Sequence, residues 1–600
     1  MFLVMNFVTQ NPKTPIAQQI WEMKYRFGAE ASVEQTFARV AQAVALAEPA
    51  SQRSQLAKLF YDVMADFRFL PAGRILAGAG TGRAVTLFNC FVMDSISDSI
   101  PGIFSNLNEA AQTLQQGGGI GHDFSTLRPK GATVHGVGAE ASGPLSFMDV
   151  WDSMCRTIMS AGARRGAMMG TLRCDHPDIE AFIAAKRDPA KLRNFNLSVL
   201  ITDAFMAAVK SDSEWPMQFG GEVFKTIKAR DLWQQIMQAT FDYAEPGVIF
   251  IDRINSLNPL AYCETISCTN PCGEQPLPPY GACLLGSLNL TRFVKASFTS
   301  DAHLDLELLQ HTAKVAIRFL DDVIDVSNYP LAQQKQEAIN KRRLGLGVTG
   351  LADALLMCGF RYGSAEAVSA SQIWMRTIQE SAMDASITLA EEKGSFPLFV
   401  AEVYLNTAYG GSLSPHHRKA ISKHGLRNGL LTSIAPTGTI SLLAGNVSSG
   451  IEPIFNASYE RRIKEADGGD RTEVLEDYAV GLWRSAQNTS LPPHTVTVNN
   501  LSPDDHLAMQ SAVQPFIDSS ISKTINVPEN LPFADFVSVY EKAYALGLKG
   551  CTTFRPNAVT GSILMDRSED HGKCPSCGSE NLIHNEGCVS CSSCGFALCG

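Results

Sequence analysis

The residues of this sequence best suited to chemistry surround one cysteine, Cys272, which has Asn270 and Glu274 at alternate positions on either side. In an extended backbone, side chains two residues apart point to the same side, so this spacing predicts a cluster of an amide, a thiol and a carboxylate. Pro271 and Gly273 would point the other way, stiffening the loop and allowing a ligand to approach closely. A buried structural cysteine is the common alternative, but the neighbouring carboxylate argues against it. We therefore expect a sulfur-centred reactive group with an acid or base and a hydrogen-bonding anchor.

A second group of cysteines lies near the C-terminus in two Cys-x-x-Cys-Gly segments, residues 574–578 and 591–595. Four thiolates at this spacing are close to the pattern of a zinc ribbon, with each glycine permitting the tight turn that aims backbone amides at sulfur. The sequence therefore predicts a Zn²⁺ site formed by Cys574, Cys577, Cys591 and Cys594.

Two further cysteines of this region, Cys588 and Cys599, are left over. One of them could replace a metal ligand, or the two could form a mobile dithiol that carries electrons by thiol–disulfide exchange. The sequence alone leaves both interpretations open.

Glycine-rich segments offer three candidate ligand loops. Residues 436–441, Pro-Thr-Gly-Thr-Ile-Ser, follow a strand-like run and could present backbone N–H groups and hydroxyls to an anion, although a plain strand-to-helix turn is an equal alternative. Residues 345–350 match a dinucleotide fingerprint but follow a charged helical pattern (334–343) instead of a strand. Residues 117–121 follow a predicted helix (101–116) and are at best a loop that a ligand approaches.

Composition is that of an ordinary globular enzyme. The chain has 600 residues, 45% hydrophobic and 18% charged, with a formal net charge of −10 that argues against general nucleic-acid binding. We find no membrane-spanning apolar run and no signal peptide. A cytoplasmic protein is expected, in which the 15 cysteines are thiols, metal ligands or redox pairs.

The pattern along the chain predicts four regions. Residues 1–80 are helical in pattern, and residues 81–556 alternate short β-like runs (197–201, 248–251, 430–434 and 495–498) with helical stretches, as in an α/β architecture with parallel strands. Residues 557–573 are polar and indicate a linker, and residues 574–600 form the separate cysteine-rich module.

Taken together, these segments resemble the large subunits of ribonucleotide reductases, specifically the adenosylcobalamin-dependent class II enzymes. The resemblance runs from about residue 16 to residue 600 and is carried by blocks in the expected order: 87–92, 117–121, 127–131, 142–147, 270–274, 281–290, 436–441 and 550–556.

The resemblance implies a ten-stranded α/β barrel, made of two five-stranded parallel halves packed antiparallel, with a central finger loop that carries Cys272. Cys272 would become a thiyl radical that takes the 3′ hydrogen of a ribonucleotide; the radical would come from adenosylcobalamin. Glu274 would act as base toward the 3′-OH and Asn270 would hold the ribose hydroxyls. Cys90 and Cys283 would help expel the 2′-OH as water and end as a disulfide. The implied substrate-binding residues are Gly118, Gly119, Pro436, Thr437, Gly438, Thr439 and Ile440.

Several features favour class II within this family. The chain has no Tyr-Tyr pair, which a class I large subunit uses as a radical relay, and no glycyl-radical motif near its end, as in class III. The segment 301–306 begins like the Asp-x-His-x-x-Gly element of proteins that ligate cobalamin through histidine, but it ends in leucine. That departure agrees with a class II enzyme, in which cobalamin keeps its own base.

The resemblance also implies partners. Deoxynucleoside triphosphate effectors would bind at a homodimer interface, where Asp94 is the expected effector-binding acid and Lys186 and Arg187 begin an expected mobile loop; a solvated turn is the alternative for that loop. We expect no counterpart of the separate N-terminal ATP-binding cone of many relatives, and therefore control of specificity without overall on–off control by ATP and dATP. Thioredoxin or glutaredoxin would re-reduce the tail.

Two functions other than ribonucleotide reduction are also considered, and each leads to a different expected result. A nicotinamide dehydrogenase using residues 345–350 would bind NAD(H) tightly and would not need cobalamin. A non-catalytic zinc-ribbon binding protein would carry its activity in residues 574–600 alone.

Overall fold

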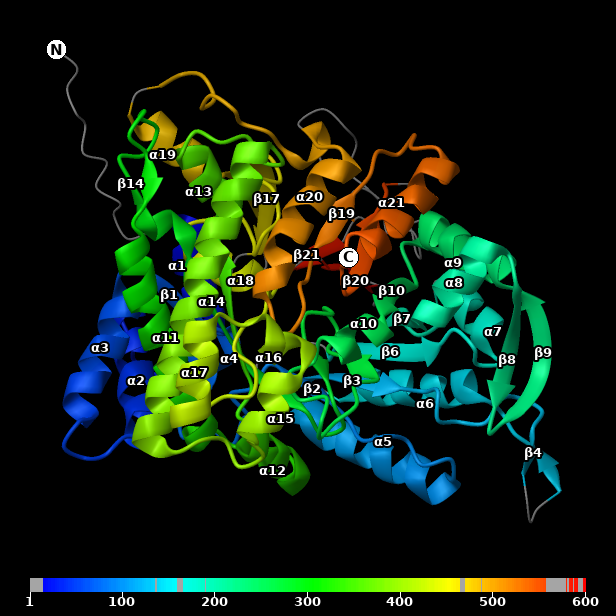
Figure 1. Cartoon of the computed structure of the whole chain (residues 1–600). Helices are drawn as coiled ribbons and strands as arrows, with labels where there is room; N and C mark the ends of the chain where they lie inside the picture. Colours follow the sequence, from blue (N-terminus) through cyan, green and yellow to red (C-terminus); the bar gives the residue numbers. More distant parts are fainter. Residues whose placement is uncertain are drawn as a thin grey trace.

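The computed structural model describes residues 14–134, 138–158, 166–188, 190–464, 470–486 and 488–556, together with Ser579 and short backbone segments at 582–585, 588–591 and 597–599. Its centre is a set of strands surrounded by helices, with the N-terminal helices packed on one side (Figure 1). No helix in the described ranges is long and apolar enough to cross a membrane.

The N-terminal helices form a layer against the outside of the barrel. They comprise α1 (Pro15–Ile20), the π-helical turn η1 (Trp21–Tyr25), α2 (Val33–Val44), η2 (Ala45–Ala47), α3 (Arg53–Ala65) and α4 (Gly73–Gly78). Helix α2 buries Phe37, Val40 and Val44, which lie three and four residues apart and so share one face. This apolar face packs against α3 and α11 (Leu306–Val326).

Five parallel strands form the first half of the barrel. They are β2 (Cys90–Val92), β3 (Gly119–Asp123), β6 (Met168–Arg173), β7 (Phe195–Ile201) and β10 (Gly247–Phe250), each paired in parallel with the next. They are connected by helices, as parallel strands require. Nearly every residue of β6, β7 and β10 is buried, because both faces of the sheet are covered.

The second half is also parallel. It contains β13 (Ala282–Asn289), β16 (Leu344–Thr349), an extended segment at 430–434, β19 (Thr524–Asn526) and β20 (Gly550–Phe554). Single bridges join Leu346 to Thr432 and Ile434 to Ile521, so the 430–434 segment lies between β16 and the chain entering β19.

Antiparallel pairing of β2 with β13 and of β10 with β20 closes the ring. The ten-stranded α/β barrel with antiparallel halves is thereby confirmed as an architecture. The ten strands joined in one sheet include β1 (Phe69–Pro71), which pairs with β13 outside the ring, whereas the 430–434 segment is joined only by bridges.

Helices and small hairpins cover this ring. The helices are α5 (Ile100–Gln115), α6 (Pro144–Thr157), α7 (Ile179–Ala184), α8 (Asp203–Ser211), α9 (Ala229–Tyr243), α10 (Ile251–Ser256), α11, α12 (Ala332–Lys341), α13 (Leu351–Met357), α14 (Ala365–Lys393), α15 (Ala401–Asn406), α16 (Ala408–Ser412), α17 (Pro415–His424), α18 (Gly438–Leu443), α19 (Tyr478–Ser485), α20 (Pro503–Val513) and α21 (Phe533–Ala545). The hairpins pair β4 (Thr133–Val134) with β5 (Ala139–Glu140), β8 (Glu214–Phe219) with β9 (Glu222–Lys228), β14 (Val294–Lys295) with β15 (His303–Leu304), and β17 (Ser458–Lys464) with β18 (Asp470–Glu476).

Some local sequence predictions were wrong. Residues 495–498, predicted as a strand, are irregular apart from the start of a 3-10 turn. Residues 119–121, predicted as a loop, form the beginning of β3. The helix predicted at 101–116 is confirmed as α5, where Ser99 caps the first turn and Pro101 lies within it.

Candidate active site

A short hairpin carries the Asn-Pro-Cys-Gly-Glu segment. Its strands are β11 (Cys268–Thr269) and β12 (Pro276–Leu277). Between them the chain turns back: Asn270 N–H donates to Gln275 O at 3.1 Å, and Gly273 N–H donates to Asn270 O at 3.0 Å. Gly273 has φ = 78°, a left-handed conformation that glycine adopts without strain.

The extended backbone expected for this segment is therefore wrong, and its side chains meet for a different reason. The turn brings Asn270 and Glu274 together across its base and leaves Cys272 at its tip. Asn270 and Glu274 are only 1% and 2% exposed, whereas Cys272 is exposed.

Both halves of the barrel hold this hairpin. The Asn196 side chain on β7 donates to Pro271 O at 2.9 Å. On the other half, Ser433 Oγ and Ser520 N–H both donate to Glu274 O, at 3.0 and 3.1 Å. A hairpin bonded to strands from both halves lies between them, so its backbone is fixed from two sides.

Close approach of the hairpin to β3 requires glycine. A Cβ atom at Gly121 would lie 2.0 Å from Thr269 O and 2.9 Å from Cys268 Sγ. At Gly119, two residues earlier, a Cβ would meet Pro271 and Asn89 O, both at an ordinary 3.5 Å. Within the glycine-rich sequence at 117–121, Gly121 is therefore the residue that makes room for the hairpin.

The Asn270 amide joins the reactive groups. Its Nδ2 donates to Glu274 Oε2 at 2.8 Å and to Cys90 Sγ at 3.2 Å, and its Oδ1 accepts from Gln275 N at 2.9 Å. All of its polar atoms are thus engaged, which fixes the amide orientation and places the carboxylate and the thiol on either side of it.

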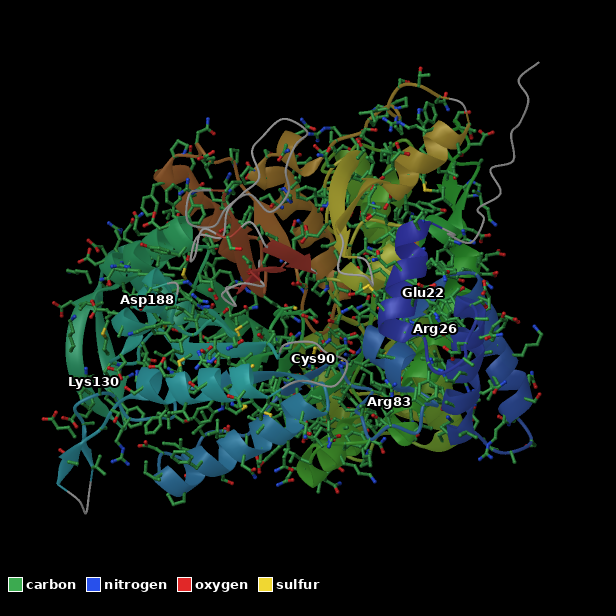
Figure 2. The ribbon with its side chains drawn as sticks, turned by 180° about the vertical axis from the view of Figure 1, so that it is seen from behind. Glu22, Arg26, Arg83, Cys90, Lys130 and Asp188 are labelled. Carbon is green, nitrogen blue, oxygen red and sulfur yellow. The ribbon has the colours of Figure 1, made fainter. Side chains whose placement is uncertain are left out.

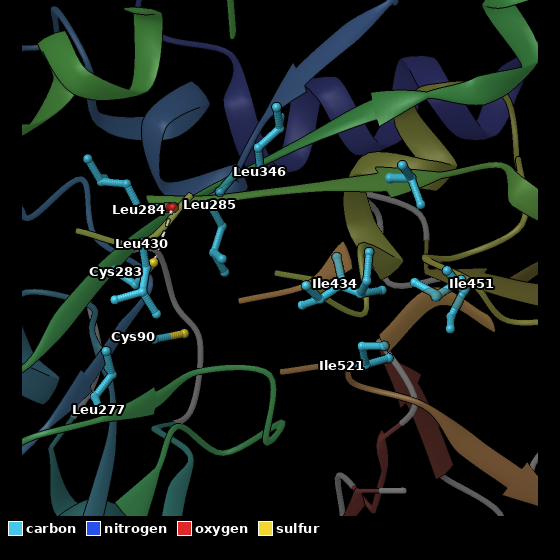
Figure 3. Close-up of a cluster of buried hydrophobic side chains, with 14 of the residues drawn as sticks. Cys90, Leu277, Cys283, Leu284, Leu285, Leu346, Leu430, Ile434, Ile451 and Ile521 are labelled. Carbon is cyan, nitrogen blue, oxygen red and sulfur yellow. Dashed lines mark hydrogen bonds between the residues drawn. The ribbon is translucent and has the colours of Figure 1, made fainter. Parts of the chain in front are cut away.

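Cys90 and Cys283 face each other across antiparallel strands. They are register partners on β2 and β13, and Figure 3 shows both side chains in the same apolar interior. Register partners have Cα atoms about 4.5–5.5 Å apart, within the range that a disulfide spans. The pair can therefore be oxidised without moving the strands.

The charges around the thiols are interdependent. Burial raises the pKa of Cys90 well above its ordinary value, and the negative charges of Glu274, Cys272 and Cys283 raise it further. Three thiols and one carboxyl group therefore influence one another at this site, and Cys272 belongs to the cluster although it is exposed.

Glu274 is suited to proton transfer near neutral pH. Burial raises its pKa to about 7, an effect only partly opposed by the hydrogen bond from Asn270. A carboxyl group with this pKa can accept and return a proton at neutral pH with little cost.

The Pro-Thr-Gly-Thr segment forms the turn before α18. Thr437 adopts a left-handed conformation with φ = 56°, and its Oγ1 accepts from Gly450 N at 2.8 Å and bonds Thr349 Oγ1 at 3.0 Å. These contacts stabilise a conformation unusual for a β-branched residue. Of the residues predicted to bind substrate, Thr437, Thr439 and Ile440 are largely buried, and Gly118 packs under the Phe91 ring.

The dinucleotide-like sequence 345–350 serves a packing role. Residues 344–349 are barrel strand β16, preceded by helix α12, so the strand–loop–helix context of a dinucleotide site is absent here. A Cβ at Gly347 would lie 2.2 Å from Ser433 O, and one at Gly345 would lie 2.8 Å from Gln275 Nε2. These glycines allow neighbouring chain segments to approach.

The predicted effector residues lie in two other places. Asp94 follows β2, and its charge acts on Tyr280, which also bonds Glu109 of α5 at 3.1 Å. Lys186 pairs with Glu245 at 3.0 Å and donates to two backbone carbonyls, so it supports the loop internally. Arg187 is exposed. Figure 2 shows Asp188 near the edge of the molecule and Cys90 in its middle.

Only part of the tail lies within the described residues. Backbone pairing joins β21 (Leu582–Asn585), β22 (Cys588–Cys591) and β23 (Ala597–Cys599), and places Cys588 opposite Cys599. Of the predicted zinc ligands, Cys574, Cys577 and Cys594 lie outside the described residues, and Cys591 ends β22. No cluster of possible metal ligands occurs among the residues whose side chains are described.

One residue of the site has no counterpart in the sequence predictions. Arg343 is 3% exposed and precedes β16 beside Cys283. The basic run of residues 341–343 gave no signal of a buried role, because such runs usually face solvent.

Comparison with known proteins agrees with this geometry. The ribonucleotide reductase barrel domain matches residues 88–554, and the ribonucleotide reductase all-alpha domain matches residues 12–84. The chain belongs to the ribonucleotide reductase family, whose members reduce ribonucleotides to deoxyribonucleotides.

Within that family the similarity is strong to one group. The chain is 38% identical to a vitamin B12-dependent ribonucleoside-diphosphate reductase of Mycobacterium tuberculosis, over 86% of this chain and 74% of the relative. It is 37% identical to the enzyme of that name from Thermoplasma acidophilum, over 84% and 66%. Identity to the ribonucleoside-diphosphate reductase large subunit of Caenorhabditis elegans is 27%, over 89% and 75%.

Proposed function

We propose that this chain is an adenosylcobalamin-dependent reductase of ribonucleoside diphosphates, in which Cys272 is the hydrogen-abstracting residue. The main support is the side-chain amide of Asn270, which donates hydrogen bonds to both Glu274 and Cys90 inside the barrel. Cys272 lies exposed at the tip of the same turn. The similarity to vitamin B12-dependent relatives supports the cofactor assignment.

The arrangement of the thiols suits the proposed cofactor. Adenosylcobalamin, when bound, supplies a radical by homolysis of its cobalt–carbon bond. Cys272 is the accessible member of the cluster, so it is the side chain that would meet this radical source. The surface histidine His303, on hairpin strand β15, bonds its own loop at Asp301 O. We therefore do not assign His303 to the cobalt.

Each residue has a separate task in the reaction. Cys272, as a thiyl, takes the 3′ hydrogen atom; Glu274 removes the 3′-OH proton; and Asn270 orients the ribose hydroxyls. Cys90 and Cys283 then supply two electrons and two protons as the 2′-OH leaves as water, and they end as a disulfide. The family's finger loop corresponds in this proposal to the hairpin of residues 268–277, which holds Cys272 in position between the two halves of the barrel.

Binding of the substrate phosphates is assigned to the turn at Pro436–Ile440, with Gly118 and Gly119 lining the approach. Asp94, Lys186 and Arg187 stay predictions for the deoxynucleoside triphosphate effector, as does the homodimer. The engagement of Lys186 with Glu245 favours a supporting role for it over direct contact with an effector.

The tail is proposed to return electrons to the barrel. Cys588 and Cys599 would form the exchanging dithiol, which thioredoxin or glutaredoxin would reduce, while Cys574, Cys577, Cys591 and Cys594 would hold Zn²⁺. The register of Cys588 opposite Cys599 supports the pairing of these two residues. The cytoplasmic location also stays a prediction.

The test is ribonucleoside-diphosphate reduction with adenosylcobalamin, a dithiol reductant and effector, comparing wild type with Cys272→Ser. We expect turnover below about one-thousandth of wild type, because the hydrogen-abstracting atom is lost. Cys263→Ser, at another exposed cysteine, is the matched control and should retain activity. Full activity of Cys272→Ser, or equal turnover without cobalamin, would refute the proposal.

A further inference from the structure

We propose that Arg343 stabilises the Cys283 sulfur as the leaving thiolate when an external dithiol opens the Cys90–Cys283 disulfide, and that this dithiol attacks Cys90. The inference rests on the proposed function for the existence of the disulfide. It adds to that function a positioning residue and an order of sulfur exchange.

Arg343 lies beside Cys283, immediately before the neighbouring strand β16. The parallel register pairs Leu284 with Leu344, so the preceding residues, Cys283 and Arg343, are adjacent. Figure 3 shows Cys283 and Leu285 pointing into the barrel interior, with Leu284 and Leu346 pointing to the other side. Because side chains alternate along a strand, Arg343 lies on the interior side with Cys283.

The guanidinium of Arg343 has N–H groups that can still donate hydrogen bonds to an anion at this position. It is 3% exposed and forms an ion pair through Nη2 with Glu264. Its Nε and Nη1 are buried and have no hydrogen-bond partner within the described part of the chain. Buried donors without partners are costly, so these two N–H groups can gain by meeting an anion.

Electrostatics agree with this placement. Burial raises the pKa of Cys283 well above its ordinary value, and the positive charge of Arg343 opposes that rise. A thiolate formed at a fully buried position therefore has a fixed counter-charge next to it.

Accessibility gives the order of exchange. Cys90 is 6% exposed and Cys283 is 0% exposed. An incoming thiolate has to approach the disulfide from outside, so it reaches Cys90 Sγ first. Cys283, which lies next to Arg343, then has to be the leaving group.

Two thiol–disulfide exchanges in sequence reduce the Cys90–Cys283 disulfide. A thiolate of the external dithiol forms a bond to Cys90 Sγ, the Cys90–Cys283 bond breaks, and its electron pair goes to Cys283 Sγ, which later takes a proton. The second thiol of the reductant then displaces Cys90, leaving two protein thiols and an oxidised, disulfide-bonded reductant.

The experiment measures reopening of a chemically formed disulfide. Full-length protein carrying Cys588→Ser and Cys599→Ser is oxidised with diamide, and loss of the Cys90–Cys283 cross-linked peptide is followed by mass spectrometry after dithiothreitol is added. We expect Arg343→Gln to slow reopening at least tenfold and Arg343→Lys, which keeps the charge, to restore most of the rate.

Lys341→Gln is the matched control. Lys341 is also buried and pairs with the same Glu264, at 2.8 Å, but it lies outside the strand register with Cys283. A purely structural role of this ion cluster predicts equal slowing in Lys341→Gln and Arg343→Gln, and that outcome would overturn the proposal. Wild-type reopening in Arg343→Gln would overturn it as well.

A second measurement needs no Arg343 variant. The oxidised protein is treated briefly with 2-mercaptoethanol, quenched in acid and mapped, and the adduct is expected on Cys90; an adduct on Cys283 would refute the proposed order. Since no ribonucleotide takes part, these results are independent of turnover. Failure of ribonucleotide reduction with normal Arg343 effects would reject the proposed function alone.

Discussion

The side-chain amide of Asn270 donates to the Glu274 carboxylate at 2.8 Å, and both residues are almost fully buried between the two halves of the barrel. The two residues are four positions apart and meet because the chain reverses between them. Burial raises the pKa of Glu274 to about 7, and the hydrogen bond from Asn270 orients the carboxylate while opposing that rise only in part.

Glu274→Gln should reduce turnover by about 10²–10⁴-fold, the usual range for loss of a general base. Because the ionised form acts as base, wild-type kcat/KM should rise as pH increases through about 7, and the residual activity of the variant should lack this rise. The measurement is a pH–rate profile, with Glu222→Gln on the exposed strand β9 as control. A wild-type profile in Glu274→Gln would contradict the assigned role.

The same substitution should stabilise the fold at alkaline pH. The folded-state pKa of Glu274 lies above the ordinary value of 4.5, so folding favours the protonated carboxyl group. Its stabilising effect is complete below about pH 4.5 and is lost as pH rises through about 7. Urea denaturation should find Glu274→Gln more stable than wild type at pH 8 by about 1–3 kcal/mol, with little difference at pH 4.5. Equal stabilities at both pH values would mean that the carboxylate is solvated.

Gly121→Ala should destabilise the protein or displace the hairpin, because the added Cβ would lie 2.0 Å from the Thr269 carbonyl oxygen. We expect a loss of about 2–3 kcal/mol, the upper part of the range typical of forced overpacking. Gly119→Ala on the same strand meets only ordinary contacts and should cost less than about 1 kcal/mol. Thermal unfolding of the two variants makes the comparison, and equal melting temperatures would show that the hairpin can move aside freely.

The packing of the N-terminal helices against the rest of the protein should depend on one buried carboxylate, that of Glu48. Glu48 bonds Arg318 of α11 at 2.7 Å and Lys393 of α14 at 2.9 Å. Burial alone would raise the pKa of Glu48, but these two cations lower it to about 2.

Glu48→Gln should therefore cost about 3 kcal/mol in unfolding free energy, because it leaves buried cations short of a partner. Lys58→Gln, which removes the exposed pair with Asp62, should cost below about 0.5 kcal/mol. The contribution of Glu48 is present above pH about 4.5 and should be lost as pH falls toward 2. Urea denaturation at pH 7 and pH 3 measures both effects, and a smaller loss in Glu48→Gln than in Lys58→Gln would contradict them.

Removing the tail should leave reduction of one ribonucleotide intact but prevent re-reduction of the active-site disulfide. A chain lacking residues 574–600 should still produce about one deoxyribonucleotide per pre-reduced active site. It should fail in repeated turnover with a thioredoxin-type reductant. Rapid-quench and steady-state product counts give the two quantities. Normal repeated turnover after deletion would rule out the shuttle role of Cys588 and Cys599.

The sequence by itself predicted an α/β architecture with parallel strands, and its resemblance to a known family implied the ten-stranded barrel and the proposed reactive residues. Buried parallel strands are signalled by apolar runs such as β10 and the last three residues of β7, and these runs depend on local composition. The Asn-Pro-Cys-Gly-Glu segment likewise combines residue types that a core does not need. Such signals are local, and so they can be recognised without knowing which segments meet.

Only the tertiary structure decided how these residues meet. Residues 270–274 form a turn and not the expected extended segment with alternating side chains. Hydrogen bonds from Asn196, Ser433 and Ser520, which are far apart in sequence, fix this hairpin. Arg343 became a buried neighbour of Cys283 through strand register, and the glycines at 121 and 347 proved to accommodate carbonyl oxygens of other segments. Register and close packing arise from contacts between distant segments, and no local pattern of residues encodes them.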